Sequence, residues 1–185
     1  MRAFSFQAFG LYKDSGTGSS LKQRDYKDAT DLIVGHGGGN MDTVENTVVR
    51  RLTPLECERL QGFPDNWTLI GEPVEKVLPD GTIEIERYFI GTDGKRKKVS
   101  DSARYKALGN SIATPFWFYL LRRIAAQYER PATLGSLFDG IGGFPYCWER
   151  CNGKGTAIWA SEIEEFPIAV TKAHFPEEDP DNDES

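Results

Sequence analysis

The pattern of hydrophobic and polar positions changes from one segment of the chain to the next, and each pattern predicts a type of secondary structure. Residues 1–45 are rich in glycine, serine and aspartate, and their one apolar run, Leu32 to Val34, predicts a short strand between loops. Residues 74–90 alternate about Asp80 and Gly81, and a second Asp-Gly pair follows at residues 93–94. This segment is typical of a β-hairpin, here with a basic turn.

Residues 52–62 contain the signals of a short helix. Thr53 stands at the N-cap position, proline follows it, and Glu56 lies at the third helical position. This combination is a capping box with a proline start, and it predicts a helix from Pro54 to about Gln61. Gly62 is suited to the left-handed cap that ends such a helix.

The last part of the chain combines helix and strand patterns. Thr114 and Pro115 repeat the cap-and-proline start, which predicts a helix to about Tyr128. Beyond Pro131, strand and helix patterns alternate, as in a doubly wound α/β sheet. The expected elements are a strand at 134–138, a glycine turn at 139–143, a helix to about 150, a strand at 156–160 and a helix at 164–174.

The composition is that of one folded domain. The 185 residues are 39% hydrophobic and 12% aromatic, which is enough to form a packed interior. No apolar stretch is long enough to span a membrane, and residues 1–10 are too polar for a secretory signal, so we expect a cytoplasmic protein. Three cysteines without paired C-x-x-C units predict free thiols and no metal site. Neither His36 nor His174 has neighbours at metal or catalytic-triad spacing.

The net charge of −6 is unevenly distributed. Residues 131–185 carry three basic and eleven acidic side chains, and the acidic end, 177–185, is expected to be disordered. Residues 87–130 instead carry ten basic and three acidic side chains, a local excess that attracts phosphate. The run from Lys95 to Lys98 is therefore either a DNA contact or a solvated hairpin tip.

A glycine turn directly after a buried strand is suited to ligand binding. Glycines let the chain turn tightly and let a ligand approach the N–H groups at the next helix N-terminus. Glu162 follows the second predicted strand, where such folds place a carboxylate that accepts hydrogen bonds from ribose hydroxyls. The pattern also fits an ordinary tight turn and a solvated carboxylate, but the pair together favours a nucleoside cofactor.

Four segments resemble motifs of the DNA cytosine-5 methyltransferases. LFDGIGGF at 137–144 is similar to their first motif, and WASEIE at 159–164 to their second. RRLTPLECERLQGFPD at 50–65 resembles the ninth motif, YKALGNSI at 105–112 resembles the tenth, and residues 1–45 resemble the end of the target-recognition region. The four motif matches are independent of one another, which makes chance resemblance negligible.

The resemblance implies an α/β fold: part of an S-adenosylmethionine-dependent methyltransferase (Rossmann-like) domain with part of a target-recognition domain. Residues 1–104 would hold the recognition part, 105–176 the cofactor-binding part and 177–185 the acidic tail. Double-stranded DNA is the implied substrate, and restriction-modification or a prophage the implied setting. The family's ninth motif mainly organises the recognition domain, so Arg51, Glu56 and Arg59 are expected to be structural. Carried over by position, the implied cofactor-binding residues are Phe138, Asp139, Gly140, Ile141, Gly142, Gly143, Glu162, Ile163, Asn110 and Ser111, and the DNA-binding candidates are Arg24, Lys27, Lys95, Arg96, Lys97 and Lys98.

The chain departs from the family pattern in two ways. The ninth and tenth motifs precede the first, which implies a circular permutation. The Pro-Cys, Glu-Asn-Val and paired-arginine motifs that carry the chemistry are missing, so no catalytic residue is assigned. Only two of the strands this fold needs are present, and we therefore expect the isolated chain to be poorly folded or completed by a second polypeptide.

Three hypotheses follow for function. The first is a split or partial cytosine-5 methyltransferase that is inactive alone. The second is a non-catalytic DNA-binding or regulatory remnant that uses the basic region. The third, a nicotinamide-dependent oxidoreductase, shares the glycine turn but leaves the ninth- and tenth-motif matches unexplained.

Overall fold

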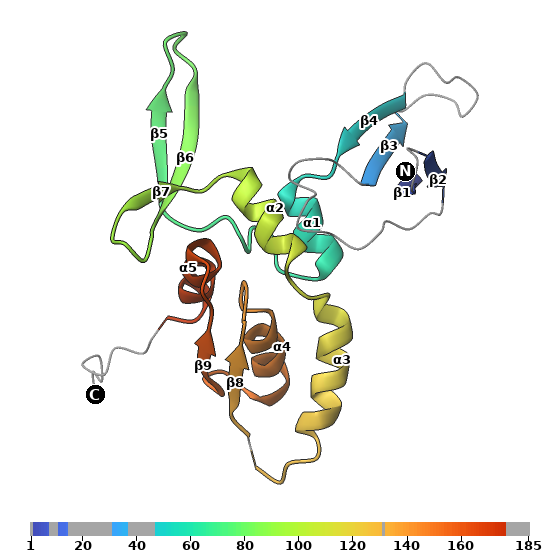
Figure 1. Cartoon of the computed structure of the whole chain (residues 1–185), viewed down its shortest axis with the longest axis vertical. Helices are drawn as coiled ribbons and strands as arrows, with labels where there is room; N and C mark the ends of the chain where they lie inside the picture. Colours follow the sequence, from blue (N-terminus) through green and yellow to red (C-terminus); the bar gives the residue numbers. More distant parts are fainter. Residues whose placement is uncertain (1, 8–10, 15–30, 37–46, 131, 177–185) are drawn as a thin grey trace.

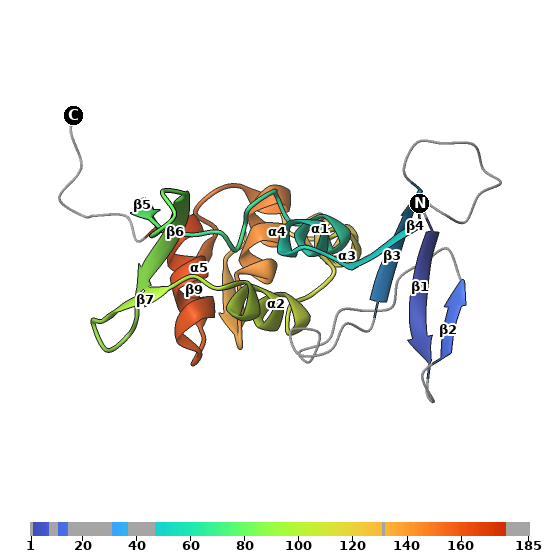
Figure 2. The same ribbon diagram turned by 90° about the horizontal axis from the view of Figure 1, so that it is seen from above.

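The structure is a computed structural model that describes residues 2–7, 11–14, 31–36, 47–130 and 132–176, with side chains from Arg51 onward. Arg24, Lys27 and the acidic tail at 177–185 lie outside the described residues. Figures 1 and 2 show the N-terminal strands on one side of the molecule and most of the helices gathered at its centre.

The N-terminal region forms a four-stranded antiparallel sheet. Its strands are β1 (Arg2–Gln7), β2 (Leu11–Asp14), β3 (Asp31–His36) and β4 (Thr47–Arg51), in the order β2-β1-β3-β4. The predicted strand at 32–34 is confirmed within β3. The expectation of loop was wrong for Arg2–Gln7 and Leu11–Asp14, and the alternation in Arg2–Gln7 is itself a strand signal. Both views show this sheet set apart from the helices.

The helix α1 (Pro54–Gln61) begins and ends as its sequence predicts. Thr53 Oγ1 accepts a hydrogen bond from Glu56 N at 3.3 Å, and Glu56 Oε2 accepts one from Thr53 N at 2.8 Å. Gly62 takes the left-handed conformation, with φ of 79°, and its N–H bonds to Arg59 O. The capping box is therefore confirmed, and it accounts for Thr53 and Glu56 without any chemical role.

The hairpin after α1 is confirmed and carries a third strand. β5 (Pro73–Val77) pairs with β6 (Ile83–Ile90), and β6 pairs with β7 (Arg96–Lys98), all antiparallel. The expected basic turn was wrong: the turn is made by Asp93 and Gly94, and the basic residues that follow form the edge strand β7. The β5–β6 hairpin projects from the rest of the molecule in Figure 1.

Two helices link this sheet to the C-terminal part. They are α2 (Asp101–Gly109) and α3 (Thr114–Ala125), and α3 ends before the expected Tyr128. The expected N-cap role of Thr114 was wrong, because Ala113 is the cap and makes no side-chain hydrogen bond. Thr114 is instead buried and donates from Oγ1 to Gln61 O at 2.9 Å, so its hydroxyl ties α3 to α1.

The C-terminal part has the predicted order of strand, glycine turn, helix, strand and helix. β8 (Leu134–Leu137) lies parallel to β9 (Ala157–Ser161), and α4 (Gly143–Asn152) and α5 (Glu165–His174) follow the two strands. A parallel pair joined through a helix is the repeating unit of doubly wound sheets. The chain thus has a mixed α/β fold, and its C-terminal part has the element order of a Rossmann-like domain, as the sequence indicates.

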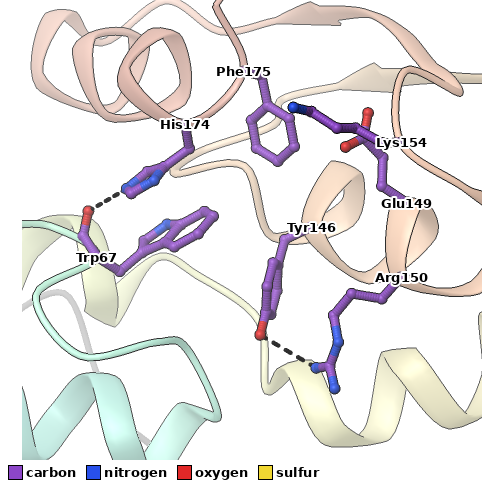
Figure 3. Close-up of a pocket in the computed structure, with 7 residues that line it drawn as sticks. All are labelled: Trp67, Tyr146, Glu149, Arg150, Lys154, His174 and Phe175. Atoms are coloured by element: carbon purple, nitrogen blue, oxygen red, sulfur yellow. Dashed lines mark hydrogen bonds between the residues drawn. The ribbon is translucent and has the colours of Figure 1, made fainter.

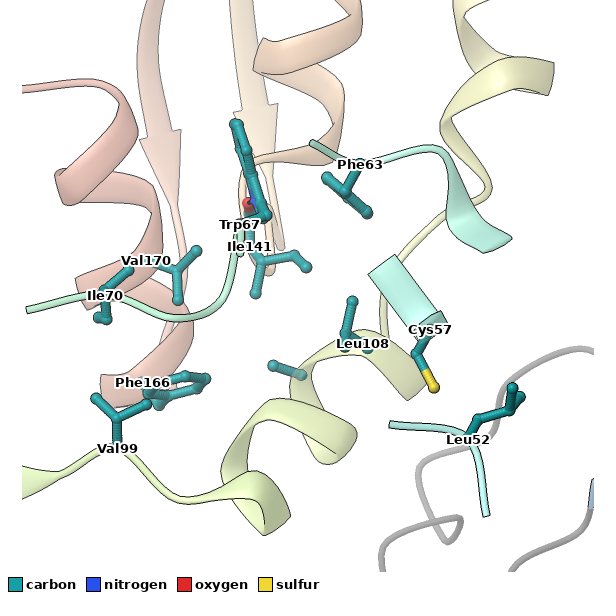
Figure 4. Close-up of a cluster of buried hydrophobic side chains, with 11 residues drawn as sticks. Leu52, Cys57, Phe63, Trp67, Ile70, Val99, Leu108, Ile141, Phe166 and Val170 are labelled. Atoms are coloured by element: carbon teal, nitrogen blue, oxygen red, sulfur yellow. Dashed lines mark hydrogen bonds between the residues drawn. The ribbon is translucent and has the colours of Figure 1, made fainter. Parts of the chain in front are cut away.

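The main hydrophobic core joins segments that are far apart in the sequence (Figure 4). Leu108 of α2 and Val170 of α5 are completely buried, as is Ile141 of the glycine turn. Trp67, from the loop after α1, packs on the same cluster. A second cluster, Leu121, Cys147 and Trp148, holds α3 against α4. The core therefore fixes the loop after α1, the end of α2 and the glycine turn together.

Candidate functional site

The glycine turn bends the chain sharply at the carboxyl end of β8. Gly140 and Gly142 have φ of 61° and 80°, in the left-handed region that glycine adopts readily. Phe138 has φ of 53°, which is uncommon for a residue with a side chain, and its ring is 87% exposed. Asp139 N donates to Ser161 O at 3.0 Å, which ties the turn to the end of β9.

Glu162 lies against this turn. Its Oε2 accepts a hydrogen bond from Gly140 N at 2.7 Å, and its Oε1 accepts from Ile163 N at 2.6 Å and Glu164 N at 3.0 Å. Burial acts to raise the pKa of this carboxyl, but the three backbone N–H groups outweigh it, and the pKa is lowered from its ordinary value. Glu162 is therefore an anion near neutral pH, held at the carboxyl ends of both parallel strands.

Asp139 is the buried acid of the turn. Its Oδ1 accepts from Ser136 Oγ at 2.5 Å, and its Oδ2 has no hydrogen-bond partner among the described residues. Burial, with a smaller contribution from the charge of Glu162, raises the pKa of this carboxyl above its ordinary value. The hydroxyl of Thr171 donates to Gly140 O at 3.2 Å, which ties the turn to α5. The pKa of Asp139 is raised and that of Glu162 is lowered, so the two acids have different environments on the same turn.

The segments that resemble the ninth and tenth motifs meet the glycine turn. A Cβ on Gly143 would stand 2.8 Å from Ile112 Cγ1, directly after the tenth-motif residues Asn110 and Ser111. Trp67 Nε1 donates to Ile141 O at 2.8 Å across the buried core. The side chains of Asn110 and Ser111 make no hydrogen bond within the part of the chain that the structure describes, and Asn110 is exposed.

The structure brings some of the predicted cofactor residues together and leaves others apart. Gly140 and Glu162 are joined directly, and Gly143 touches the segment that carries Asn110 and Ser111. Ile141 instead points into the core, where it is completely buried. Ile163, like Phe138, is 87% exposed, so two apolar side chains flank Glu162 and the turn on the open side.

A buried ion pair that the sequence analysis did not single out holds α1 against α2. Glu58 is completely buried, and its Oε1 accepts from Arg104 Nη2 at 3.2 Å and from Thr68 N at 2.9 Å. Its Oε2 accepts from Asn66 N at 2.8 Å. The sequence does contain a signal for this pair, because Glu58 stands at a core-facing helix position where an acid needs a partner. The sequence does not show that the partner is Arg104, 46 residues away.

The basic residues of β7 are surrounded by acids. Lys98 pairs with Glu86 at 2.7 Å and Lys97 pairs with Glu165 of α5. Arg96 lies over the ring of Tyr88 at 4.0 Å. Lys98 first, then Tyr88 and Lys76, lower the pKa of Glu86 to about 2 through hydrogen bonds. These contacts reduce the local positive excess, and the DNA-contacting role of Lys95–Lys98 stays a prediction.

No cysteine of the described part resembles an activated nucleophile. Cys147 is completely buried, and burial raises the pKa of its thiol to about 11. Burial also raises the pKa of Cys151, one turn further along α4. None of the three cysteines forms a disulfide, and the described residues contain no cluster of acids, histidines and cysteines able to hold a metal ion. No helix in the described part is long and apolar enough to cross a membrane.

A pocket of about 270 Å³ opens beside α4 and the end of α5 (Figure 3). His174, which the sequence analysis left without a role, stacks on Trp67 with ring centroids 3.6 Å apart and an interplanar angle of 4°. Its Nε2 donates to Trp67 O at 2.7 Å. The lining residues are Trp67, Tyr146, Glu149, Arg150, Lys154, His174 and Phe175.

Comparison with known proteins adds to this geometry. Residues 5–77 match the family model of the C-5 cytosine-specific DNA methylases. A DNA N-6-adenine-methyltransferase of Escherichia phage P1 is 33% identical over an alignment of 182 residues, covering 67% of this chain and 24% of that protein. The type II methyltransferase M.NlaX of Neisseria lactamica is 26% identical over 132 residues, covering 71% and 29%. M1.ScrFI, a type II methyltransferase of Lactococcus lactis subsp. cremoris, is 28% identical over 114 residues, covering 62% and 20%.

The chain is similar to the C-5 cytosine-specific DNA methylases in residues 5–77, and to type II methyltransferases over a larger share of its length. The family model covers the N-terminal sheet, α1 and β5, and therefore includes the segment that resembles the ninth motif. The chain spans less than a third of the length of each of these relatives.

Proposed function

We propose that the chain is one part of a circularly permuted, S-adenosylmethionine-dependent DNA cytosine-5 methyltransferase, and that it supplies half of the cofactor site. The observation that carries this is the 2.7 Å hydrogen bond from Gly140 N to Glu162 Oε2, which joins the glycine turn after β8 to the acid after β9. The match of residues 5–77 to the family model and the contact of Gly143 with the tenth-motif segment support it.

The residues present fit the proposed cofactor. A carboxylate has about four lone-pair sites, and Glu162 uses three, so it retains capacity for a ribose hydroxyl. The exposed side chains of Phe138 and Ile163 offer apolar surface to an adenine ring. The polar side chains of Asn110 and Ser111, which make no hydrogen bond to other described residues, belong to the segment that contacts the turn through Ile112 and Gly143. When bound, S-adenosylmethionine supplies an electrophilic methyl group.

A calorimetric titration with S-adenosylmethionine tests the cofactor site. Gly140→Ala places a side chain at φ of 61° beside the proposed ligand and is expected to abolish measurable binding. Gly155→Ala is the matched control, since Gly155 also has positive φ, at 77°, and open space around it, but lies in the turn before β9. Glu162→Gln is expected to weaken binding about 10-fold through the loss of charge-assisted hydrogen bonds. Equal affinities for all three variants would contradict the assignment.

Methyl transfer requires groups that this chain does not supply. A thiolate must add to cytosine C6 of a base flipped out of the duplex, and the buried thiol of Cys147 is unsuited to that step. We therefore propose a second polypeptide that carries the nucleophile and the missing strands. Co-expression of the flanking reading frames with this chain is expected to restore methylation of duplex DNA, whereas the pure chain transfers no methyl group.

We propose that the methylated base is cytosine. The family model favours cytosine C5, whereas the phage P1 relative is named for adenine N6. That relative is matched over 24% of its length, so its adenine chemistry need not involve the shared segment. Digestion of the methylated DNA to nucleosides distinguishes the two: 5-methylcytosine supports our proposal, and N6-methyladenine alone would replace it with an adenine enzyme.

A non-catalytic DNA-binding remnant is the second candidate, favoured by the basic strand β7. Its DNA contacts would be Arg24, Lys27 and Lys95 to Lys98. Binding by electrostatics alone falls steeply as salt rises and ignores sequence. Replacing Lys95 to Lys98 with alanine would abolish it, whereas unchanged binding would reject this candidate. For the setting we propose restriction-modification in a bacterial cytoplasm, and the type II methyltransferase names of two bacterial relatives support the restriction-modification part.

A further inference from the structure

The pocket beside α4 has aromatic walls supplied by three separate segments. Trp67 comes from the loop after α1, Tyr146 from α4 and Phe175 from the end of α5. The rings of Trp67 and Tyr146 lie 5.0 Å apart with their planes tilted by 54°, and Trp67 meets Phe175 edge-on at 6.2 Å. In Figure 3 these three rings surround one space. Walls of this kind accommodate a flat ring better than a flexible aliphatic chain.

The rim of the pocket carries two cations. Among the residues that the structure describes, neither Arg150 nor Lys154 forms an ion pair with a carboxylate, and Arg150 donates only to the hydroxyl of Tyr146, at 3.2 Å. The one acid of the pocket, Glu149, accepts from Gly155 N at 2.9 Å and pairs with neither cation. Figure 3 shows the ammonium of Lys154 reaching toward Phe175. The pocket therefore has an excess of positive charge next to aromatic surface.

The walls are held rigidly in place. His174 covers one face of Trp67 and donates to its carbonyl oxygen, which fixes the loop after α1 against α5. Trp67 Nε1 is bound to Ile141 O, and a Cβ on Gly142 would stand 2.9 Å from Phe175 Cε2. A preformed pocket loses little conformational entropy when a ligand enters it.

From this combination we infer that the pocket binds a nucleotide, with the base packed among Trp67, Tyr146 and Phe175 and the phosphate at Arg150 and Lys154. The ligand is a free nucleotide or an unstacked base of a DNA strand, which present the same chemistry. Guanidinium and ammonium groups bind phosphate, and aromatic rings stack on bases of any sequence. The pocket adjoins the glycine turn, because Trp67 and Phe175 contact Ile141 and Gly142, but its lining includes no residue of the turn and not Glu162, so it is a different site from the proposed cofactor site.

Calorimetric titration of the full chain tests the inference with three probes: thymidine 5′-monophosphate, thymidine and inorganic phosphate. The monophosphate is expected to bind more tightly than either half of it. Lys154→Met and Arg150→Gln should each weaken the monophosphate about 10-fold while leaving thymidine unchanged. The matched controls are Lys172→Met and Arg122→Gln, two exposed cations outside the pocket. All four positions are exposed at the surface, so circular dichroism should show the same fold for every variant.

Competition with oligonucleotides identifies the source of the ligand. Displacement of the monophosphate by single-stranded oligothymidine, but not by duplex, assigns the pocket to an unstacked base, whereas displacement by neither assigns it to a free nucleotide. The inference is overturned if the monophosphate binds no more tightly than thymidine, or if the pocket variants and their controls lose affinity equally. Because S-adenosylmethionine is absent from these titrations, their failure leaves the proposed function standing.

Discussion

At the scale of single residues, two acids on one turn are set to opposite behaviour by their surroundings. Glu162 accepts three backbone N–H bonds, which lower its pKa, whereas burial raises the pKa of Asp139. The sequence predicts that Glu162 belongs to a cofactor site, because its position after a strand is visible in the chain. It does not reveal the burial of Asp139, which depends on packing against α5 and the end of β9.

Replacement of Asp139 by asparagine is expected to stabilise the chain at neutral pH. The folded-state pKa of Asp139 is raised, so its favourable contribution is complete below the unfolded-state pKa and is lost as pH rises through the folded-state value. Asp139→Asn keeps the acceptor for Ser136 and removes the buried charge, for a gain on the order of 1 kcal/mol at pH 7. Urea unfolding across pH 3–8 measures this difference, which should vanish near the acid end.

Asp80→Asn is the control with the opposite sign. The backbone N–H of Thr82 lowers the pKa of Asp80, so that carboxylate stabilises the fold above its unfolded-state pKa and loses this effect as pH falls. The asparagine variant should therefore be slightly less stable than the parent at neutral pH. A parallel pH response of the two variants would contradict the assignment of Asp139 as a buried, partly desolvated acid.

At the scale of elements, local signals predicted helices well and tertiary contacts poorly. The capping box predicted the start of α1 and Gly62 predicted its end, because the hydrogen bonds of both caps join residues close together in the sequence. The same signal failed at Thr114, whose hydroxyl donates to Gln61 O instead, because α3 packs against the end of α1. The basic run became an edge strand because the second Asp-Gly pair forms a turn of its own. The contact between the glycine turn and Glu162 was predictable, because both follow neighbouring parallel strands. The aromatic pocket was not predictable, because its walls come from three segments that lie far apart in the sequence.

The ion pair between α1 and α2 is expected to be the most sensitive contact between elements. Arg104→Met leaves the completely buried Glu58 carboxylate without its cation, which typically costs about 3–5 kcal/mol. The double variant Glu58→Leu with Arg104→Met should lose less than the sum of the single losses, since neither charge is then unpaired. Urea unfolding of the two single variants and the double variant measures the coupling.

The control for this pair is the exposed bridge between Arg59 and Asp65, whose atoms approach to 2.6 Å. Arg59→Met should change the unfolding midpoint little, because both side chains are more than half exposed and solvent screens their attraction. A loss at Arg59 as large as that at Arg104 would show that proximity, rather than burial, governs the strength of these bridges.

At the scale of the whole molecule, the parallel sheet is incomplete. Within the part of the chain that the structure describes, β8 and β9 pair only with each other, and α4 contacts both strands. Leu137, Ile158 and Trp159 are 63%, 59% and 51% exposed, and apolar side chains of α3 also reach solvent. Parallel sheets normally lie between helices on both faces. The proposed second polypeptide would therefore add its strands at the open edges of β8 and β9 and cover the exposed apolar side chains with its helices.

This arrangement predicts low stability for the chain alone and a large gain on complementation. The purified chain should melt broadly at low temperature, because the open strand edges and exposed apolar face lose the burial that a full sheet provides. Mixing with the complementing polypeptide should sharpen the transition and raise its midpoint in proportion to the logarithm of the partner concentration. A cooperative, high-temperature melt of the chain alone would contradict the proposal that a second polypeptide completes the sheet.

A pair of lysine substitutions locates the surface on which the partner docks. Leu137→Lys places a charge on the exposed face of β8 and should weaken complementation by at least 10-fold, because the lysine would be buried under the partner's elements that cover this face. Val77→Lys is matched to it, since Val77 is also a strand residue, 69% exposed, but lies on the projecting β5–β6 hairpin. Calorimetric titration of both variants with the partner compares them directly. If the hairpin variant is the one that fails, the partner docks on the projecting hairpin, and the open sheet edge must be closed in another way.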